Sequence, residues 1–126
     1  MKRLLDQLPL VLAALFAAGA LFHLAAILVP TLGNAASLAR HAVFIAINAF
    51  FATAFFARWR FTIVPVLALA AQQLYGHGAD LLRAHAEGRT DVQSLLVLLF
   101  LPVVVASAVR LTRAPSRAAP IPGRTE

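Results

Sequence analysis

Long apolar runs alternate with short clusters of charged residues along the chain. Four runs contain no Asp, Glu, Lys or Arg and cover residues 8–29, 41–57, 61–79 and 92–109. About 20 helical residues cross the roughly 30 Å core of a bilayer. Helix is the expected form, because an open strand in lipid would leave its backbone groups unpaired. The pattern predicts an all-α, four-helix transmembrane bundle with spans at about 8–29, 36–57, 61–79 and 92–110.

The loops between the runs carry the usual signals of helix ends. Asn34 or Ser37 is suited to cap the start of the second helix. The third helix is expected to continue past residue 79 into the outer loop, with Arg83 and Glu87 paired one turn apart. Gly88 is then a natural end for that extension.

The basic residues fall unequally on the two sides that these spans define. Three lie on one side (Arg40, Arg83, Arg89), and eight lie on the other (Lys2, Arg3, Arg58, Arg60, Arg110, Arg113, Arg117, Arg124). Because positive residues collect on the cytoplasmic side, both termini are predicted to be cytoplasmic. The spans form a transmembrane domain over 1–111, and residues 112–126 are expected to be a disordered basic cytoplasmic tail.

The composition supports a membrane protein. Of the 126 residues, 61% are apolar and 13% charged, whereas soluble domains have roughly 45–50% and about 25%. The net charge of +6 would suggest a nucleic-acid partner in a soluble protein. Here the basic residues flank apolar runs, so they indicate topology, and the expected partner is the lipid bilayer. Other membrane subunits or a homo-oligomer stay open as further partners.

Residue usage adds two constraints. The chain has no cysteine, which excludes disulfides, thiolate metal sites and cysteine nucleophiles. One lysine against ten arginines, with abundant alanine, fits a GC-rich bacterial genome. The expected location is therefore a bacterial inner (plasma) membrane.

A cleaved signal peptide is the alternative interpretation of the first run. A basic start followed by an alanine-rich apolar run is typical of such a leader. The run of residues 8–29 is longer than the usual signal core of about 7–15 residues, and Asp6 is unusual in a basic leader. A membrane-spanning helix is the favoured interpretation.

Few polar side chains fall inside the spans, and each is costly in lipid. Helical spacing places His23, His41 with Asn48, and Gln73 with His77 and Asp80 on one face each of the first three helices. The fourth span offers only Ser107. The predicted topology puts all four histidines on the outer side. A ligand-binding pocket is predicted there from six residues: His23, His41, His77, Asp80, Gln73 and Asn48.

Three kinds of ligand fit this set. A transition metal would use His23, His41, His77 and Asp80. A haem would use two histidines on facing helices. A quinone-type molecule would be hydrogen-bonded by His77, Gln73 or Asn48 in an apolar cleft.

The sequence also limits the function. It has no nucleophile–base pair, phosphate loop or HExxH pattern, so an enzyme is not expected. A non-enzymatic accessory or structural component of a membrane assembly is the first prediction, and a metal, haem or quinone binder is the alternative. An oligomeric small-solute transporter is less favoured, because no Asp or Glu lies within a span.

Overall fold

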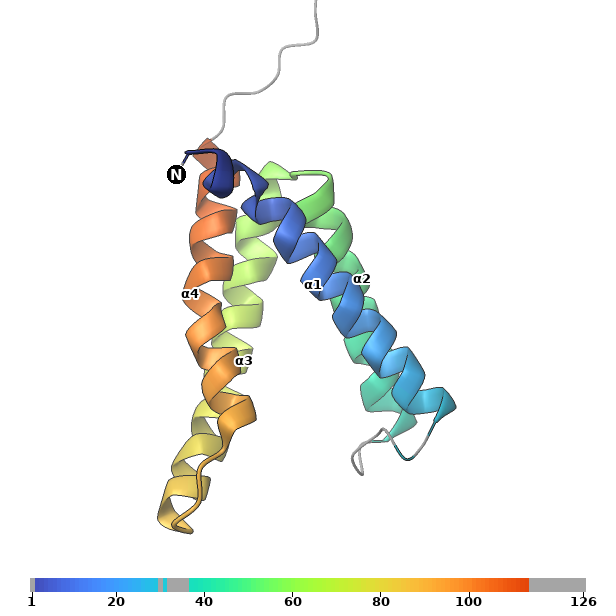
Figure 1. The fold of residues 1–126 in the computed structure, drawn as a ribbon, viewed down its shortest axis with the longest axis vertical. Coiled ribbons are helices and arrows are strands. Elements are labelled where there is room, and N and C mark those ends of the chain that lie inside the picture. Colours follow the sequence, from blue (N-terminus) through green and yellow to red (C-terminus); the bar gives the residue numbers. More distant parts are fainter. Residues whose placement is uncertain (1, 30, 32–36, 114–126) are drawn as a thin grey trace, which may run out of the picture.

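The computed structural model describes residues 2–29, 31 and 37–113, and these form helices (Figure 1). The long helices are α1 (Lys2–Leu28), α2 (Leu38–Phe56), α3 (Ile63–Ala86) and α4 (Val92–Arg113). A short 3-10 turn, η2 (Arg60–Thr62), leads into α3. The described residues contain no strand, which agrees with the all-α prediction.

Three of the helices are long and apolar enough to cross a membrane. They are α1 from Asp6 to Leu28, α2 and α4. The fourth, α3, has the length but is less apolar, because it carries Gln72, Gln73, His77 and Asp80. The prediction of long apolar helices is thus confirmed for three of the four.

The four helices form two pairs that diverge from one end of the molecule. Figure 1 shows α1 running antiparallel along α2, and α3 running antiparallel along α4. The pairs meet where α1 begins and α4 ends, which we call the closed end. They separate toward the opposite, open end. The arrangement is a V of two helical hairpins, a detail that the prediction of a four-helix bundle does not include.

The apolar core lies at the closed end and draws on all four helices. Phe16 stacks on Phe55 with ring centroids 5.8 Å apart and planes at 8°. Lipid tails are as apolar as these side chains, so close packing and not the hydrophobic effect holds such helices together. The buried cluster consists of Leu12, Ala13, Phe51, Phe55, Val66, Val104, Ala108 and Leu111.

Polar contacts fasten the closed end. The Arg58 guanidinium donates to the Asp6 carbonyl at 3.0 Å, and the Asp6 carboxylate pairs with Arg110 at 3.7 Å. Arg60 donates to the Thr112 carbonyl at 3.2 Å. These contacts connect the short turn after α2 to both the start of α1 and the end of α4. They hold the two hairpins together where their backbones converge.

The ends of the helices agree with several local signals. The Ser37 hydroxyl caps α2 by accepting from the Arg40 amide at 3.3 Å, whereas Asn34 lies outside the described residues. Gly88 follows α3 with φ +68, a conformation that favours glycine.

One prediction about the charged residues at the end of α3 is wrong. Arg83 pairs with Asp80 at 3.6 Å, while Glu87 pairs with Arg89 at 2.6 Å. The predicted pairing of Arg83 with Glu87 is therefore wrong, because each finds an opposite charge nearer along the chain. Helix α4 continues to Arg113, past the predicted start of the tail at residue 112. Residues 114–126 lie outside the described part of the chain.

Candidate functional site

A cavity of about 430 Å³ lies between the two hairpins. Pockets for small molecules usually measure about 300–1,000 Å³. All four helices contribute to its wall. The polar lining residues are His23, Arg40, His41, Asn48, Gln73, His77 and Gln93, and the apolar ones are Phe16, Phe22, Phe44, Ile47, Leu69, Val97, Phe100, Leu101 and Val104.

Two histidines meet across α1 and α2 in this wall. The Nδ1 atoms of His23 and His41 lie 3.1 Å apart, and the His41 side chain is buried. The His23 ring also stacks on Phe44, with centroids 5.0 Å apart and planes at 13°. A hydrogen bond between two ring nitrogens needs a lone pair on one of them. The contact therefore requires at least one neutral ring.

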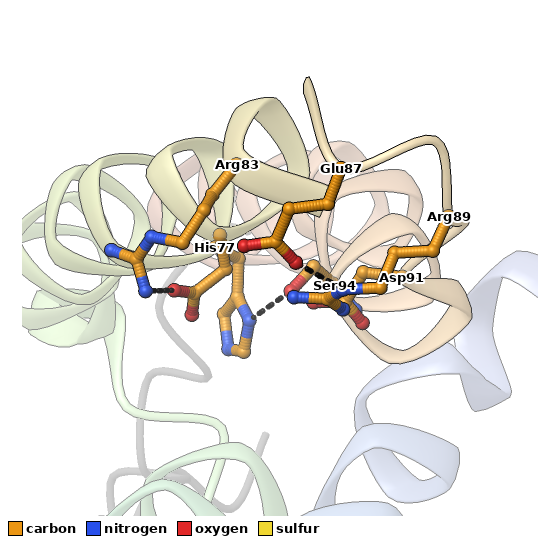
Figure 2. A network of polar contacts seen from close by, with 7 residues as sticks. His77, Arg83, Glu87, Arg89, Asp91 and Ser94 are labelled. Atoms are coloured by element: carbon orange, nitrogen blue, oxygen red, sulfur yellow. Dashed lines mark hydrogen bonds and ion pairs between the residues drawn. The ribbon is translucent and has the colours of Figure 1, made fainter. Parts of the chain in front are cut away.

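The third histidine is held by a chain of hydrogen bonds on the other hairpin. His77 Nδ1 lies 2.9 Å from the Ser94 hydroxyl oxygen, and that hydroxyl donates to Asp91 Oδ2 at 2.7 Å. The Ser94 amide donates to Asp91 Oδ1 at 3.0 Å. Figure 2 shows His77 and Asp91 on either side of Ser94, with the second ring nitrogen of His77 turned away from Ser94. Ser94 is only 2% exposed.

The charge on Asp91 sets the direction of this chain. The backbone N–H of Ser94, and then its hydroxyl, lower the pKa of Asp91 below the ordinary value. Asp91 is therefore an ionised acceptor at neutral pH. Because the single hydroxyl proton of Ser94 goes to that carboxylate, the Ser94 oxygen accepts from His77.

Asn48 and Gln73 also line the cavity, one from each hairpin. The Asn48 amide nitrogen donates to the Phe44 carbonyl at 2.8 Å within α2. Its side chain lies against Gly19 of α1, where an added Cβ would come within 2.6 Å of the amide oxygen. The side chain of Gln73 is half-buried.

The structure separates Asp80 from the other five predicted residues. Asp80 is exposed, pairs with Arg83 and does not line the cavity. Within the described ranges, no group of three or more His, Asp or Glu side chains is placed to hold a metal ion. His23, His41, His77, Gln73 and Asn48 share the cavity wall.

The sequence analysis did not identify Ser94 and Gln93 as site residues. Both lie in the first turn of α4. Ser94 follows Asp91 by three residues at the start of an apolar run, and this spacing is a helix N-cap signal. That signal predicts the contact with Asp91 but gives no sign of the contact with His77, 17 residues away. Ser107, the one polar residue expected in this span, is buried without a hydrogen-bond partner.

A second, mostly apolar groove adjoins the cavity between α2 and α3. It shares Phe44, Ile47 and Leu69 with the cavity wall. Its other lining residues include the exposed Val43 and Phe50. The groove therefore lies directly beside the cavity, between the hairpins, and reaches the exposed apolar surface.

Comparisons of the chain with protein family models, with curated proteins and with solved structures gave no match.

Proposed function

We propose that this chain is a four-span protein of a bacterial inner membrane in which α3 also crosses the bilayer. Support comes from the pairing of α3 with α4, since two helices packed side by side cover a similar depth. Gln73 and His77 line the cavity instead of facing outward. Polar side chains within spans usually face the interior of the bundle in this way.

We propose further that both termini are cytoplasmic, as the distribution of basic residues indicates. The closed end then lies at the cytoplasmic surface and the cavity opens toward the outer side. The polar residues of the cavity are thus near the outer aqueous phase, while its lateral groove meets the lipid.

In this setting the cavity binds a small, membrane-soluble organic molecule. The observation that carries the proposal is the convergence of His23, His41 and His77 from both hairpins on one cavity with aromatic walls. Asn48 and Gln73 supply further hydrogen-bonding groups. Ligand sites typically combine an apolar lining with a few convergent polar groups. The groove between α2 and α3 gives such a molecule a route from the bilayer.

The other predicted functions have less support. An accessory role rests on short loops and apolar surface, which a lipid-facing protein of any function shares. The metal alternative has less support because Asp80 does not line the cavity. The haem alternative has less support because His23 and His41, one pair on facing helices, are hydrogen-bonded to each other. A transporter still lacks a carboxylate within a span.

The proposal is tested by asking what purifies with the protein. Wild-type protein in lipid nanodiscs would be extracted and its small molecules identified by mass spectrometry, with metal content and the visible spectrum recorded on the same sample. Val97 lines the cavity, so Val97→Trp places a larger side chain in it. Leu96→Trp is the control, because Leu96 is 61% exposed and outside the cavity.

We expect a stoichiometric organic molecule in wild type and Leu96→Trp, and its loss in Val97→Trp. A Soret band or a stoichiometric metal would replace this proposal with the haem or metal alternative. A protein that carries nothing and binds no aromatic probe would overturn ligand binding and return the accessory role to first place.

A further inference from the structure

We propose that the ligand carries a hydroxyl group on an aromatic ring, as in a phenol or hydroquinone, and donates this hydroxyl to Nε2 of His77. Ser94 and Asp91 are positioning residues, because they act through His77 and do not touch the ligand. The inference rests on the proposed function and specifies the chemical class of its ligand.

The direction of each hydrogen bond between His77, Ser94 and Asp91 follows from a count of their protons. Asp91 accepts both the amide and the hydroxyl proton of Ser94. The Ser94 oxygen has no second proton, so its 2.9 Å contact with His77 requires a proton on His77 Nδ1. A neutral imidazole with its proton on Nδ1 has a lone pair on Nε2. In its neutral form, His77 is therefore a hydrogen-bond acceptor on the cavity side.

The lone pair on His77 Nε2 is available to a ligand in the cavity. His77 lines the cavity, and within the described residues no hydrogen bond involves its Nε2. Figure 2 shows this nitrogen on the side of the ring away from Ser94. His77 is half-buried, and its Nε2 is an acceptor that a ligand in the cavity can reach. A ligand with an O–H group supplies the donor, and a ligand with only ether or carbonyl oxygens does not.

The aromatic residues of the cavity wall indicate the shape of the ligand. Four phenylalanines contribute to the cavity wall, and they come from α1, α2 and α4. Aromatic rings pack well against such walls in stacked or edge-on arrangements. A planar ring therefore fits the wall, and its hydroxyl meets His77. The four are Phe16, Phe22, Phe44 and Phe100.

The test uses two probes of nearly equal size, 1-naphthol and 1-methoxynaphthalene. Only the first has a hydroxyl proton to donate. Their dissociation constants are measured by fluorescence titration of protein in nanodiscs, with protein-free nanodiscs as the blank. We expect wild type to bind 1-naphthol about tenfold more tightly than the ether, the difference that one hydrogen bond supplies.

Three variants and one control separate the role of the hydrogen bonds among His77, Ser94 and Asp91 from simple packing. His77→Phe keeps a ring but removes the acceptor, so the preference for 1-naphthol is lost. Ser94→Ala frees His77 to carry its proton on Nε2, so the preference falls and binding of the ether improves. Ser94→Thr keeps a hydroxyl and restores the preference. Ser107→Ala removes another buried serine of α4, outside the cavity, and leaves it unchanged.

The outcomes distinguish this inference from the function on which it rests. Equal binding of both probes by wild type overturns the hydroxyl assignment and leaves ligand binding intact. A preference that survives in His77→Phe also overturns it, because the donor would then meet another residue. If wild type binds neither probe and carries no molecule after purification, both the inference and the proposed function are wrong.

Discussion

Gly19 of α1 and Asn48 of α2 are packed so closely that no side chain fits between them. A Cβ added at Gly19 would lie 2.6 Å from the Asn48 amide oxygen. Asn48 cannot turn away freely, since its nitrogen donates to the Phe44 carbonyl at 2.8 Å. We expect Gly19→Ala to separate the helices or break that hydrogen bond, with a loss of about 1–3 kcal/mol in the free energy of unfolding. Reversible unfolding in mixed micelles measures it.

Gly78 provides the matched control for this prediction. It lies within α3, and an added Cβ there would meet nothing within 4 Å. Gly78→Ala should leave stability unchanged or raise it by up to about 1 kcal/mol, because alanine favours helix. Equal effects of the two substitutions would show that the contact with Asn48 does not limit the packing of α1 on α2.

The His23–His41 contact should contribute to the pairing of α1 with α2. His23→Phe keeps a ring that can stack on Phe44 but removes the Nδ1 atom of the contact. His41→Phe removes the Nδ1 atom of its partner. A double-mutant cycle isolates the pairwise term. We expect a coupling free energy of about 1 kcal/mol from unfolding measurements. A coupling of zero would mean that the two rings are neighbours without an energetic interaction.

Asp91 should protect the start of α4 against acid. The Ser94 N–H and hydroxyl hold the pKa of Asp91 below its ordinary value. Because the pKa is lower in the folded state, ionised Asp91 stabilises the fold fully above the ordinary aspartate range, near about pH 4. This stabilisation is lost as the pH falls through the lowered value. Carbon-13 NMR titration of the Asp91 carboxyl should give a midpoint that rises in Ser94→Ala. The same midpoint in both proteins would contradict the part of the shift assigned to the Ser94 hydroxyl, since Ser94→Ala keeps the backbone N–H.

The absence of cysteine allows a direct test of the fourth span. The chain contains none, so Gln7→Cys and Thr90→Cys each introduce a single labelling site at an exposed position. If α3 crosses the bilayer, three crossings separate these residues and they lie on opposite sides. We expect a membrane-impermeant maleimide to label Thr90→Cys in intact cells, and Gln7→Cys only after permeabilisation. Labelling of both from the same side would mean that α3 does not cross.

Local sequence patterns predicted the helices well, because their causes are local. Charges and glycine interrupt the apolar runs close to where the helices end, as at Gly88. The divergence of the hairpins was not predictable in this way. It depends on which side chains fill the closed end, such as Phe55 against Phe16. Apolar faces in a membrane sequence do not distinguish protein neighbours from lipid.

The candidate site likewise has a part that the sequence predicted and a part that it did not. The spacing of polar residues placed His23, His41 and His77 at one depth, and the structure puts all three in one cavity wall. Asp80 shares a helix face with His77 by spacing, yet it lies one turn beyond the cavity and pairs with Arg83. The role of Ser94 was not predictable, because its contact with His77 joins two helices and no local pattern encodes such a contact.

The V shape has a mechanical consequence. Contacts among all four helices are concentrated at one end, so each hairpin is a lever whose far end moves most when the joint yields slightly. In the proposed topology, the lateral pressure of the outer leaflet would act on those far ends and squeeze the space between them. The size of the cavity would then depend on the surrounding lipids as well as on the protein, and binding at the proposed site would vary with the tension of the membrane.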